Sequence, residues 1–543
     1  MSDEIRNRNT VQFKQGEPIT RPATGVRWWP LLLIIAGVTG FVMWTWLVRD
    51  AQRQDRNLAT ALAGIVGIPL VLFWCLFLSR LRWRVRLLSV GLFVAAAVTL
   101  ASLVTIRGVT GDLVPILAWR WEEALEQLKP KPAIFSTNLP AAASATMASD
   151  FPQYFGPRRN GVIDGVALAR DWSGKPPQLV WRRPVGAGWA GFAVASDQAV
   201  TIEQANGEEV VAAYVLNSGA PLWRHQYAAR YDTPVGGTGP RTVPTIISNR
   251  VYTVGATGWL TCLELDSGKR VWSKNVLAEN GAGLPAWGVA GSPLYLAGKI
   301  VVNPGGSGGR SLVAYDAATG ERVWGGGDAA ASYSSPILAS LGGAAQILMF
   351  NQPRITSHDP LTGAVLWEYK WGAGQPHVAL PLVVSDDTVM FSSGYGVGAE
   401  LLRVNRDAAG AWSVGQVWKS IRLKAKFASF VRRGDFVYGL DDGMLACVAL
   451  ADGSQRWKEG RHGHGQLLLV GDLLLVTTEG GEVVLLEPTP EAPIERGRFR
   501  AFDHKQWNPP ALAGGWLLVR TDREAACYQL PLAASASAAS TGL

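Results

Sequence analysis

The hydropathy of the chain separates an N-terminal part of long apolar stretches from a longer part of short, alternating segments. Three stretches contain no charged residue and span about 20 residues or more: Trp28–Val48, Asn57–Ser79 and Leu87–Ile106. A helix rises about 1.5 Å per residue, so each stretch can cross a hydrocarbon core about 30 Å thick. The pattern predicts three transmembrane helices within residues 28–107.

Charges and tryptophans beside these stretches predict how the chain is inserted. The first stretch is predicted to remain as an anchor, because Trp28 and Trp46 near its ends are typical of a membrane helix and not of a cleaved signal peptide. Four arginines within residues 80–86 have no acidic residue among them, whereas the basic residues of 49–56 are diluted by aspartates. The positive-inside rule therefore places the tail 1–27 in the cytoplasm and the C-terminal domain outside. We expect a multi-pass inner (plasma) membrane protein with a periplasmic or extracytoplasmic domain.

Residues 108–150 are predicted to connect the membrane part to this domain. Leu113–Leu128 contains Trp119, Trp121 and a short acidic stretch, and is expected to form either an amphipathic helix on the membrane surface or a plain linker helix. Lys129–Ser149 is rich in Pro, Ala and Ser without periodicity, which is typical of a tether.

From Phe151 onward the pattern becomes short apolar or alternating strands separated by Gly, Asn and Asp. A phrase of Asp, a small or polar residue, Gly and a following Trp recurs, as in Asp266–Trp272, Asp316–Trp324 and Asp359–Trp367. Its aromatic residues are 39 to 52 residues apart, and they are Trp181, Trp223, Trp272, Trp324, Trp367, Trp418, Trp457 and Phe499. This spacing is typical of one four-stranded blade per repeat. The sequence predicts an all-β eight-bladed propeller with four-stranded antiparallel blades over residues 151–532, followed by a disordered tail 533–543.

The repeated phrase also predicts how the ring is packed and closed. The glycine supplies a positive φ in the turn, and the tryptophan after it is large enough to fill the space between neighbouring blades. Three strands are predicted at the end of the domain, within residues 508–530, and Gln178–Val185 is expected to be the fourth strand of that blade. Such a closure removes the exposed edges of the ring.

Composition changes this picture only where it excludes functions. The net charge is +8, but residues 1–86 hold twelve Lys and Arg against five Asp and Glu, so the remainder is nearly neutral. We therefore expect no nucleic-acid binding, because the excess lies beside the membrane helices. Of the four cysteines, Cys262 and Cys447 occupy equivalent places in separate repeats, so a disulfide framework is not expected.

The phrase resembles the repeat of the pyrroloquinoline quinone (PQQ)-like propeller superfamily, which includes quinoprotein alcohol dehydrogenases and BamB-like outer-membrane assembly factors. The likeness covers residues 151–532. Three further stretches, Phe151–Pro157, Gly236–Arg241 and Gly463–Gln466, look like those of uncharacterised membrane-anchored members. The resemblance is specific for the fold and weak for the function.

Candidate ligand-binding residues lie where loops of a propeller surround the central funnel, at entries to innermost strands and exits of second strands. These positions do not repeat from blade to blade, and we select Trp189, Glu203, Arg241, His377, Tyr395, Lys424, Lys426, His464 and Trp507. One interpretation is a cationic funnel for a small anionic ligand, on which Trp189 or Trp507 stacks. The other is a solvated rim of paired charges. His462 and His464 would form a metal pair if they lie on one strand, but no third ligand is identified.

Two functions from different classes remain open. The first is a membrane-anchored binding or scaffold protein that docks a protein partner on a propeller face. The second, implied by the resemblance, is a PQQ-dependent oxidoreductase of an alcohol or sugar, with Ca²⁺ as Lewis acid and Asp441 as candidate base. The sequence has no adjacent cysteine pair and no haem-attachment Cys-x-x-Cys-His, and no catalytic set is recognised.

Overall fold

The computed structural model describes residues 25–122, 134–135, 150–372 and 374–533. The chain divides into two compact units, of which one comprises Met1–Ala51 and Asp55–Leu103, and the other comprises Gln52–Gln54 and Val104–Leu543. The tail 1–24, most of the tether and the tail 534–543 lie outside the described residues.

The first unit consists of helices: α1 (Trp29–Leu47), α2 (Arg53–Phe73), which continues as a π-helical turn η1 (Trp74–Leu78), and α3 (Trp83–Leu103). All three are long and apolar enough to cross a membrane. Gly67 allows α2 to approach α1, since a Cβ there would lie 3.1 Å from Val38. The Trp74 indole donates a hydrogen bond to the Arg27 carbonyl at 2.9 Å.

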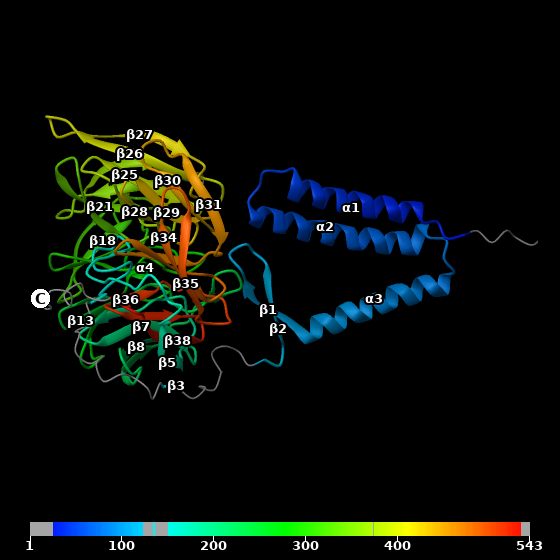
Figure 1. The fold of residues 1–543 in the computed structure, drawn as a ribbon, viewed down its shortest axis with the longest axis horizontal. Coiled ribbons are helices and arrows are strands. Elements are labelled where there is room, and N and C mark those ends of the chain that lie inside the picture. The colour runs from blue at the N-terminus through cyan, green and yellow to red at the C-terminus, as the bar shows by residue number, and fades with distance from the viewer. Residues whose placement is uncertain (1–24, 123–133, 136–149, 373, 534–543) are drawn as a thin grey trace, which may run out of the picture. The chain divides into compact units, whose positions relative to one another are not determined.

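The second unit contains an eight-bladed propeller of four-stranded antiparallel blades, as the sequence predicts (Figure 1). The first three blades are β6 (Ala193–Ala195), β7 (Gln198–Ala205), β8 (Glu208–Val215), β9 (Pro221–Tyr227); β12 (Thr245–Ile247), β13 (Arg250–Val254), β14 (Trp259–Glu264), β15 (Arg270–Asn275); and β16 (Leu294–Leu296), β17 (Lys299–Val302), β18 (Leu312–Asp316), β19 (Arg322–Gly326). The next three are β20 (Ile337–Leu341), β21 (Ala344–Phe350), β22 (Arg354–His358), β23 (Val365–Lys370); β24 (Leu382–Val383), β25 (Thr388–Ser393), β26 (Gly398–Arg406), β27 (Trp412–Ser420); and β28 (Val431–Arg433), β29 (Phe436–Asp441), β30 (Met444–Ala449), β31 (Gln455–Arg461).

The last two blades each gain a fifth strand. They are β32 (Gln466–Val470), β33 (Leu473–Thr477), β34 (Glu482–Pro488), β35 (Pro493–Arg500) with β4 (Val162–Ile163); and β36 (Ala511–Ala513), β37 (Trp516–Arg520), β38 (Glu524–Gln529), β5 (Gln178–Pro184) with β3 (Ile134–Phe135). Strand β5 pairs antiparallel with β38, where Trp181 faces Cys527. The predicted closure of the ring by residues 178–185 is confirmed.

The repeated tryptophan packs between blades, as predicted. A Cβ added at Gly219, Gly268 or Gly320 would lie 2.4–2.6 Å from the ring of the tryptophan one blade earlier. These glycines have φ between +64° and +73°, a conformation that a side chain would strain. Trp181 donates its indole N–H to the Leu216 carbonyl at 2.8 Å, and Trp418 bonds Leu450 equivalently. Each accepting residue lies three positions before the turn glycine, so the phrase joins neighbouring blades through both its glycine and its tryptophan.

The segment after α3 differs from the expectation. Val104–Val109 forms strand β1, which pairs antiparallel with β2 (Pro115–Trp119), and residues 110–114 form the turn between them. The predicted helix over Leu113–Leu128 is therefore wrong for its described part. A second small hairpin, β10 (Asp232–Thr233) with β11 (Gly237–Thr238), lies in the loop before β12, and one short helix, α4 (Val276–Glu279), follows β15.

Candidate functional site: a capped aromatic pocket in the funnel

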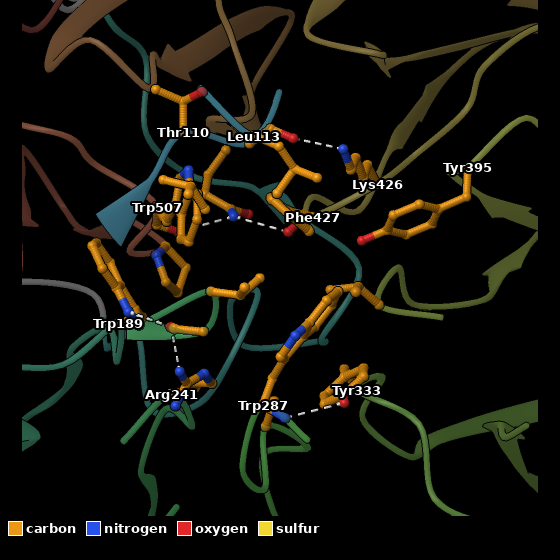
Figure 2. Close-up of a pocket in the computed structure, with 18 of the residues that line it drawn as sticks. Thr110, Leu113, Trp189, Arg241, Trp287, Tyr333, Tyr395, Lys426, Phe427 and Trp507 are labelled. Atoms are coloured by element: carbon orange, nitrogen blue, oxygen red, sulfur yellow. Dashed lines mark hydrogen bonds between the residues drawn. The ribbon is translucent and has the colours of Figure 1, made fainter. Parts of the chain in front are cut away.

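A pocket of about 230 Å³ lies among the loops that enter the innermost strands. Seven aromatic side chains line it: Tyr154, and six that Figure 2 labels, namely Trp189, Trp287, Tyr333, Tyr395, Phe427 and Trp507. Trp189 precedes β6, Phe427 precedes β28 and Trp507 precedes β36, so the blade geometry brings these distant residues to one place.

The aromatic side chains contact one another around the pocket. The centroid of the Trp507 ring lies 5.0 Å from that of Trp189 and 5.2 Å from that of Phe427. The Trp287 ring stacks on Tyr333 at 4.9 Å and meets Phe427 edge-on at 6.2 Å. Such pairs stabilise one arrangement of the rings beyond the area they bury. The result is a preformed, mainly apolar wall.

The turn of the β1–β2 hairpin covers this pocket. Val109, Thr110, Gly111 and Leu113 line it, and Figure 2 shows Thr110 and Leu113 on one side with Trp287 and Tyr333 on the other. Two lysines of the funnel donate to main-chain carbonyls of this hairpin. Lys426 Nζ donates to the Gly111 carbonyl at 2.6 Å and Lys505 Nζ to the Val109 carbonyl at 2.9 Å.

Acidic and imidazole groups hold the same turn. The Gly111 N–H donates to Glu479 Oε1 at 2.7 Å, and Glu479 Oε1 also accepts the Trp507 indole N–H at 2.9 Å. The Asp112 carboxylate lies 3.1 Å from His464 Nε2 and 3.5 Å from Arg461. Although burial opposes it, the His464 hydrogen bond and the Arg461 charge keep the pKa of Asp112 below its ordinary value.

Gly111 has no room for a side chain. A Cβ there would lie 2.1 Å from Cδ2 and 2.9 Å from Cβ of His464, whose side chain is itself buried. The turn can therefore enter the funnel this deeply only because this position is glycine.

Cationic residues of the funnel hydrogen bond to the chain itself. The Arg241 guanidinium donates to the carbonyls of Gly239, at 2.7 Å, and of Gly236 and Gly237. Burial lowers the pKa of Arg241 to about 10 and that of Lys505 to about 8. The Lys505 ammonium also lies 3.8 Å from the centroid of the Trp507 ring. The cations of this funnel thus donate hydrogen bonds to main-chain carbonyls. Neither interpretation of the sequence considered these acceptors.

Five of the nine predicted funnel residues line the pocket: Trp189, Arg241, Tyr395, Lys426 and Trp507. His464 touches the capping turn instead. Glu203 is buried, accepts the Gly186 N–H at 3.0 Å and pairs with Arg224 at 3.1 Å. Those contacts hold the loop before β6 and do not reach the pocket.

Lys424 and the candidate base Asp441 form a buried ion pair outside the pocket lining. Asp441 Oδ1 lies 2.7 Å from Lys424 Nζ, and Oδ2 lies 2.8 Å from Lys458 Nζ. Burial alone would raise the pKa of Asp441, but the two lysines outweigh it and lower the pKa. A carboxylate stabilised in this way is a weak proton acceptor, so the geometry is that of a structural ion pair.

The geometry expected for a histidine metal pair is not formed. His462 and His464 lie in the loop between β31 and β32 and not on a strand, and Gly463 between them has φ +64°. Across residues 25–122, 134–135, 150–372 and 374–533, no group of three or more His, Cys, Asp or Glu side chains is arranged to hold a metal ion.

His377 is a buried neutral residue that directly precedes Val378, which lines the pocket. Its Nδ1 bonds the Asn351 carbonyl at 2.6 Å, and its ring stacks on Phe350 at 4.2 Å. Burial lowers the pKa of His377 from 6.5 to about 4, with a smaller opposing effect of the Asn351 carbonyl. The residue therefore contributes to packing and stays uncharged at neutral pH.

This lowered pKa predicts a loss of stability in acid. Below pH 6.5 the unfolded chain takes up a proton at His377, whereas the folded chain resists protonation down to about pH 4. The free energy of unfolding is expected to fall as the pH drops through this window, and less steeply in His377→Gln. Thermal unfolding of both proteins at pH 7 and pH 5 measures the difference. Equal losses of Tm would contradict the prediction.

Several site residues were missed at the sequence level. Phe427 directly follows the selected funnel residue Lys426, whereas Tyr333 and Trp287 adjoin none of the selected residues. Glu479 follows the second strand of its blade by two residues, which is the same signal that identified Tyr395. The sequence around the hairpin turn does not indicate that the turn enters the funnel. Its partners Lys426 and Glu479 lie more than 300 positions away.

The donor set does not fit PQQ with Ca²⁺. The quinone carries three carboxylates, yet Arg241, Lys426 and Lys505 already donate to carbonyls of the chain. Within the described part of the chain no acidic cluster with the composition of a Ca²⁺ site adjoins the pocket.

Known proteins share the fold. Residues 206–459 match the family model for outer membrane protein assembly factor BamB. A europium-containing methanol dehydrogenase is similar at 12% identity over 70% of this chain and 98% of its own, with a TM-score of 0.53. Quinohemoprotein alcohol dehydrogenase from Comamonas testosteroni is similar at 14% identity over 71% and 81%, with a TM-score of 0.50. BamB from Moraxella catarrhalis has 17% identity over 66% and 99%, with a TM-score of 0.47. The search of curated proteins found no match.

Proposed function

We propose that this chain, whose propeller resembles the PQQ-like repeat family, is a membrane-anchored binding protein whose funnel receives a polypeptide turn of a protein partner. One observation carries the proposal: the funnel already holds a polypeptide turn, that of the β1–β2 hairpin. Lys426, Lys505 and Glu479 bind its carbonyl and N–H groups.

Recognition of main-chain atoms favours a protein ligand over a small anion. The two carbonyls and the N–H that the funnel binds belong to Val109, the last residue of β1, and to Gly111 in the turn, where glycine is required. Any exposed turn with glycine there offers the same groups, whatever its other side chains. The matched family is described as an assembly factor, which agrees with protein docking. The hairpin would then act as the resident occupant that a partner displaces.

The membrane anchor supports an extracytoplasmic propeller. Gln52–Gln54, at the N-terminal end of α2, belongs to the same compact unit as Val104–Leu543. Two helices separate these segments, and an even number of crossings returns the chain to one side of a membrane. The arginine-rich loop 80–86 lies between those helices, and the positive-inside rule assigns it to the cytoplasm.

A peptide competition experiment tests the proposal. The full chain in lipid nanodiscs is titrated with a fluorescent peptide of residues 104–119, and binding is followed by anisotropy. The wild-type funnel is filled by its own hairpin, so we expect Gly111→Ala, which cannot seat that hairpin, to bind the peptide at least about tenfold more tightly. A peptide that itself carries the alanine should not bind. Absence of binding to both proteins would overturn the proposal.

A partner is sought by photo-crosslinking in native membranes. A crosslinking residue at Val235, which lines the pocket and is exposed, should give one recurrent adduct that increases in the Gly111→Ala background. Leu361, exposed on a repeated turn, is the matched control position. Equal adducts from both positions would show that the funnel has no preferred partner.

A further inference from the structure

The β1–β2 hairpin has two faces of different character. In its register Ile106 lies opposite Leu117, and Val104 lies opposite Trp119. Directly paired residues of antiparallel strands project to the same side, so these four side chains share one face. Thr105 and Ala118 form the adjacent pair and project to the other side.

The first face is apolar and open. The exposed fractions are 59% for Ile106, 64% for Leu117 and 46% for Trp119. Trp121, exposed to 65%, stacks on Trp119 with ring centroids 4.8 Å apart. On the other face Ala118 is buried, as is Gly108, which a register shift after Ile106 places on that side, whereas Thr105 is polar and exposed. A contiguous exposed apolar and aromatic face on one element usually marks an interaction site.

The chain itself indicates what covers this face. Strand β1 begins at Val104, the residue directly after α3 ends at Leu103, and α3 is a 21-residue candidate membrane span. The hairpin thus starts where the hydrocarbon core ends. Tryptophans concentrate at this depth because their rings are apolar and their N–H groups need polar partners. The nearby charge of Arg107 is paired with Glu122 at 3.2 Å.

We infer that the face of Val104, Ile106, Leu117, Trp119 and Trp121 lies in the headgroup region of the bilayer, and that lipid is its partner. The inference rests on the proposed membrane anchoring and not on the ligand of the funnel. Because the turn of the same hairpin occupies the funnel, lipid contact and funnel occupancy belong to one element of 16 residues, Val104–Trp119. A change in how the hairpin meets the bilayer would then alter access to the pocket.

Face-specific quenching tests the inference. The full chain is reconstituted in phosphatidylcholine and phosphatidylglycerol vesicles that contain lipids spin-labelled near the headgroup. An environment-sensitive fluorophore is attached at Leu117→Cys or, as the matched control on the opposite face, at Thr105→Cys. The four native cysteines are buried, so the introduced thiols are labelled selectively. We expect label 117 to be quenched at least threefold more than label 105.

Ile106→Cys provides a second reporter on the same face, so that a misfolded Leu117 variant does not decide the result. Strong quenching at both 106 and 117 and weak quenching at 105 supports the inference. Equal quenching at all three sites shows mere proximity to the membrane and overturns it. Protection of 106 and 117 from both lipid and aqueous quenchers assigns the face to a protein partner, which also overturns it. The peptide competition experiment does not depend on these outcomes.

Discussion

Replacing Gly111 with alanine is expected to release the β1–β2 hairpin from the funnel. The new Cβ would lie 2.1–2.9 Å from three atoms of the buried His464 side chain, so the turn cannot keep its position. Withdrawal breaks the bonds of Gly111 to Lys426 and Glu479. Hydrogen bonds to charged groups contribute about 1.5–3 kcal/mol each, so the loss of two shifts the docked-to-released equilibrium by at least about 100-fold.

Hydrogen exchange of the hairpin amides measures this release. Peptides that cover residues 104–119 should lose most of their protection in Gly111→Ala, while the blade strands keep theirs. Gly108→Ala is the matched control, because it lies in the same hairpin and a Cβ there meets no atom closer than 3.9 Å. If both alanine variants retain the protection of the wild type, the hairpin is not held by the contacts described above.

The fold was predictable because its causes are local and repeated. In five repeats the turn glycine meets the ring of the tryptophan one blade earlier, and these are Gly219, Gly268, Gly320, Gly363 and Gly453. A single turn motif would have been ambiguous, whereas eight aromatic marks at blade spacing fix both the number of blades and the closing strand. The short strands of these blades follow from the same alternation of apolar residues.

The site was predictable only in part. Trp189, Lys426 and Trp507 were found because propeller geometry sends the entry of every innermost strand to one face. The carbonyls that accept hydrogen bonds from Lys426 and Lys505 were not predicted. Every residue has a main-chain carbonyl, so the sequence does not distinguish those of a distant hairpin. The hairpin was mistaken for a helix because Trp119 and Trp121 beside acidic residues match an amphipathic pattern. Its strand geometry depends on pairing across a tight turn and on contacts with blades hundreds of residues later.

Ring closure should be the most sensitive point of the propeller. Trp181 lies on β5, the strand that joins the first part of the domain to its last blade, and it is fully buried. Its ring packs on Gly219, and its indole N–H bonds the Leu216 carbonyl. Removing a buried tryptophan side chain costs about 3–5 kcal/mol, since the cavity refills only in part. Trp181→Ala is therefore expected to lower the free energy of unfolding by this amount.

Trp272→Ala is the comparison that separates closure from ordinary packing. Trp272 makes the equivalent contacts with the next blade, to Gly320 and the Ala317 carbonyl, but it is only partly buried. Its strand β15 belongs to a blade of consecutive strands and does not close the ring. A smaller loss is expected there, because less apolar area is removed and the neighbouring blades remain covalently consecutive. Chemical unfolding of the full chain in detergent, followed by tryptophan fluorescence, gives both values. Equal losses for the two variants would mean that closure adds nothing to blade packing, because a ring held mainly through β5 must weaken more when Trp181 is lost.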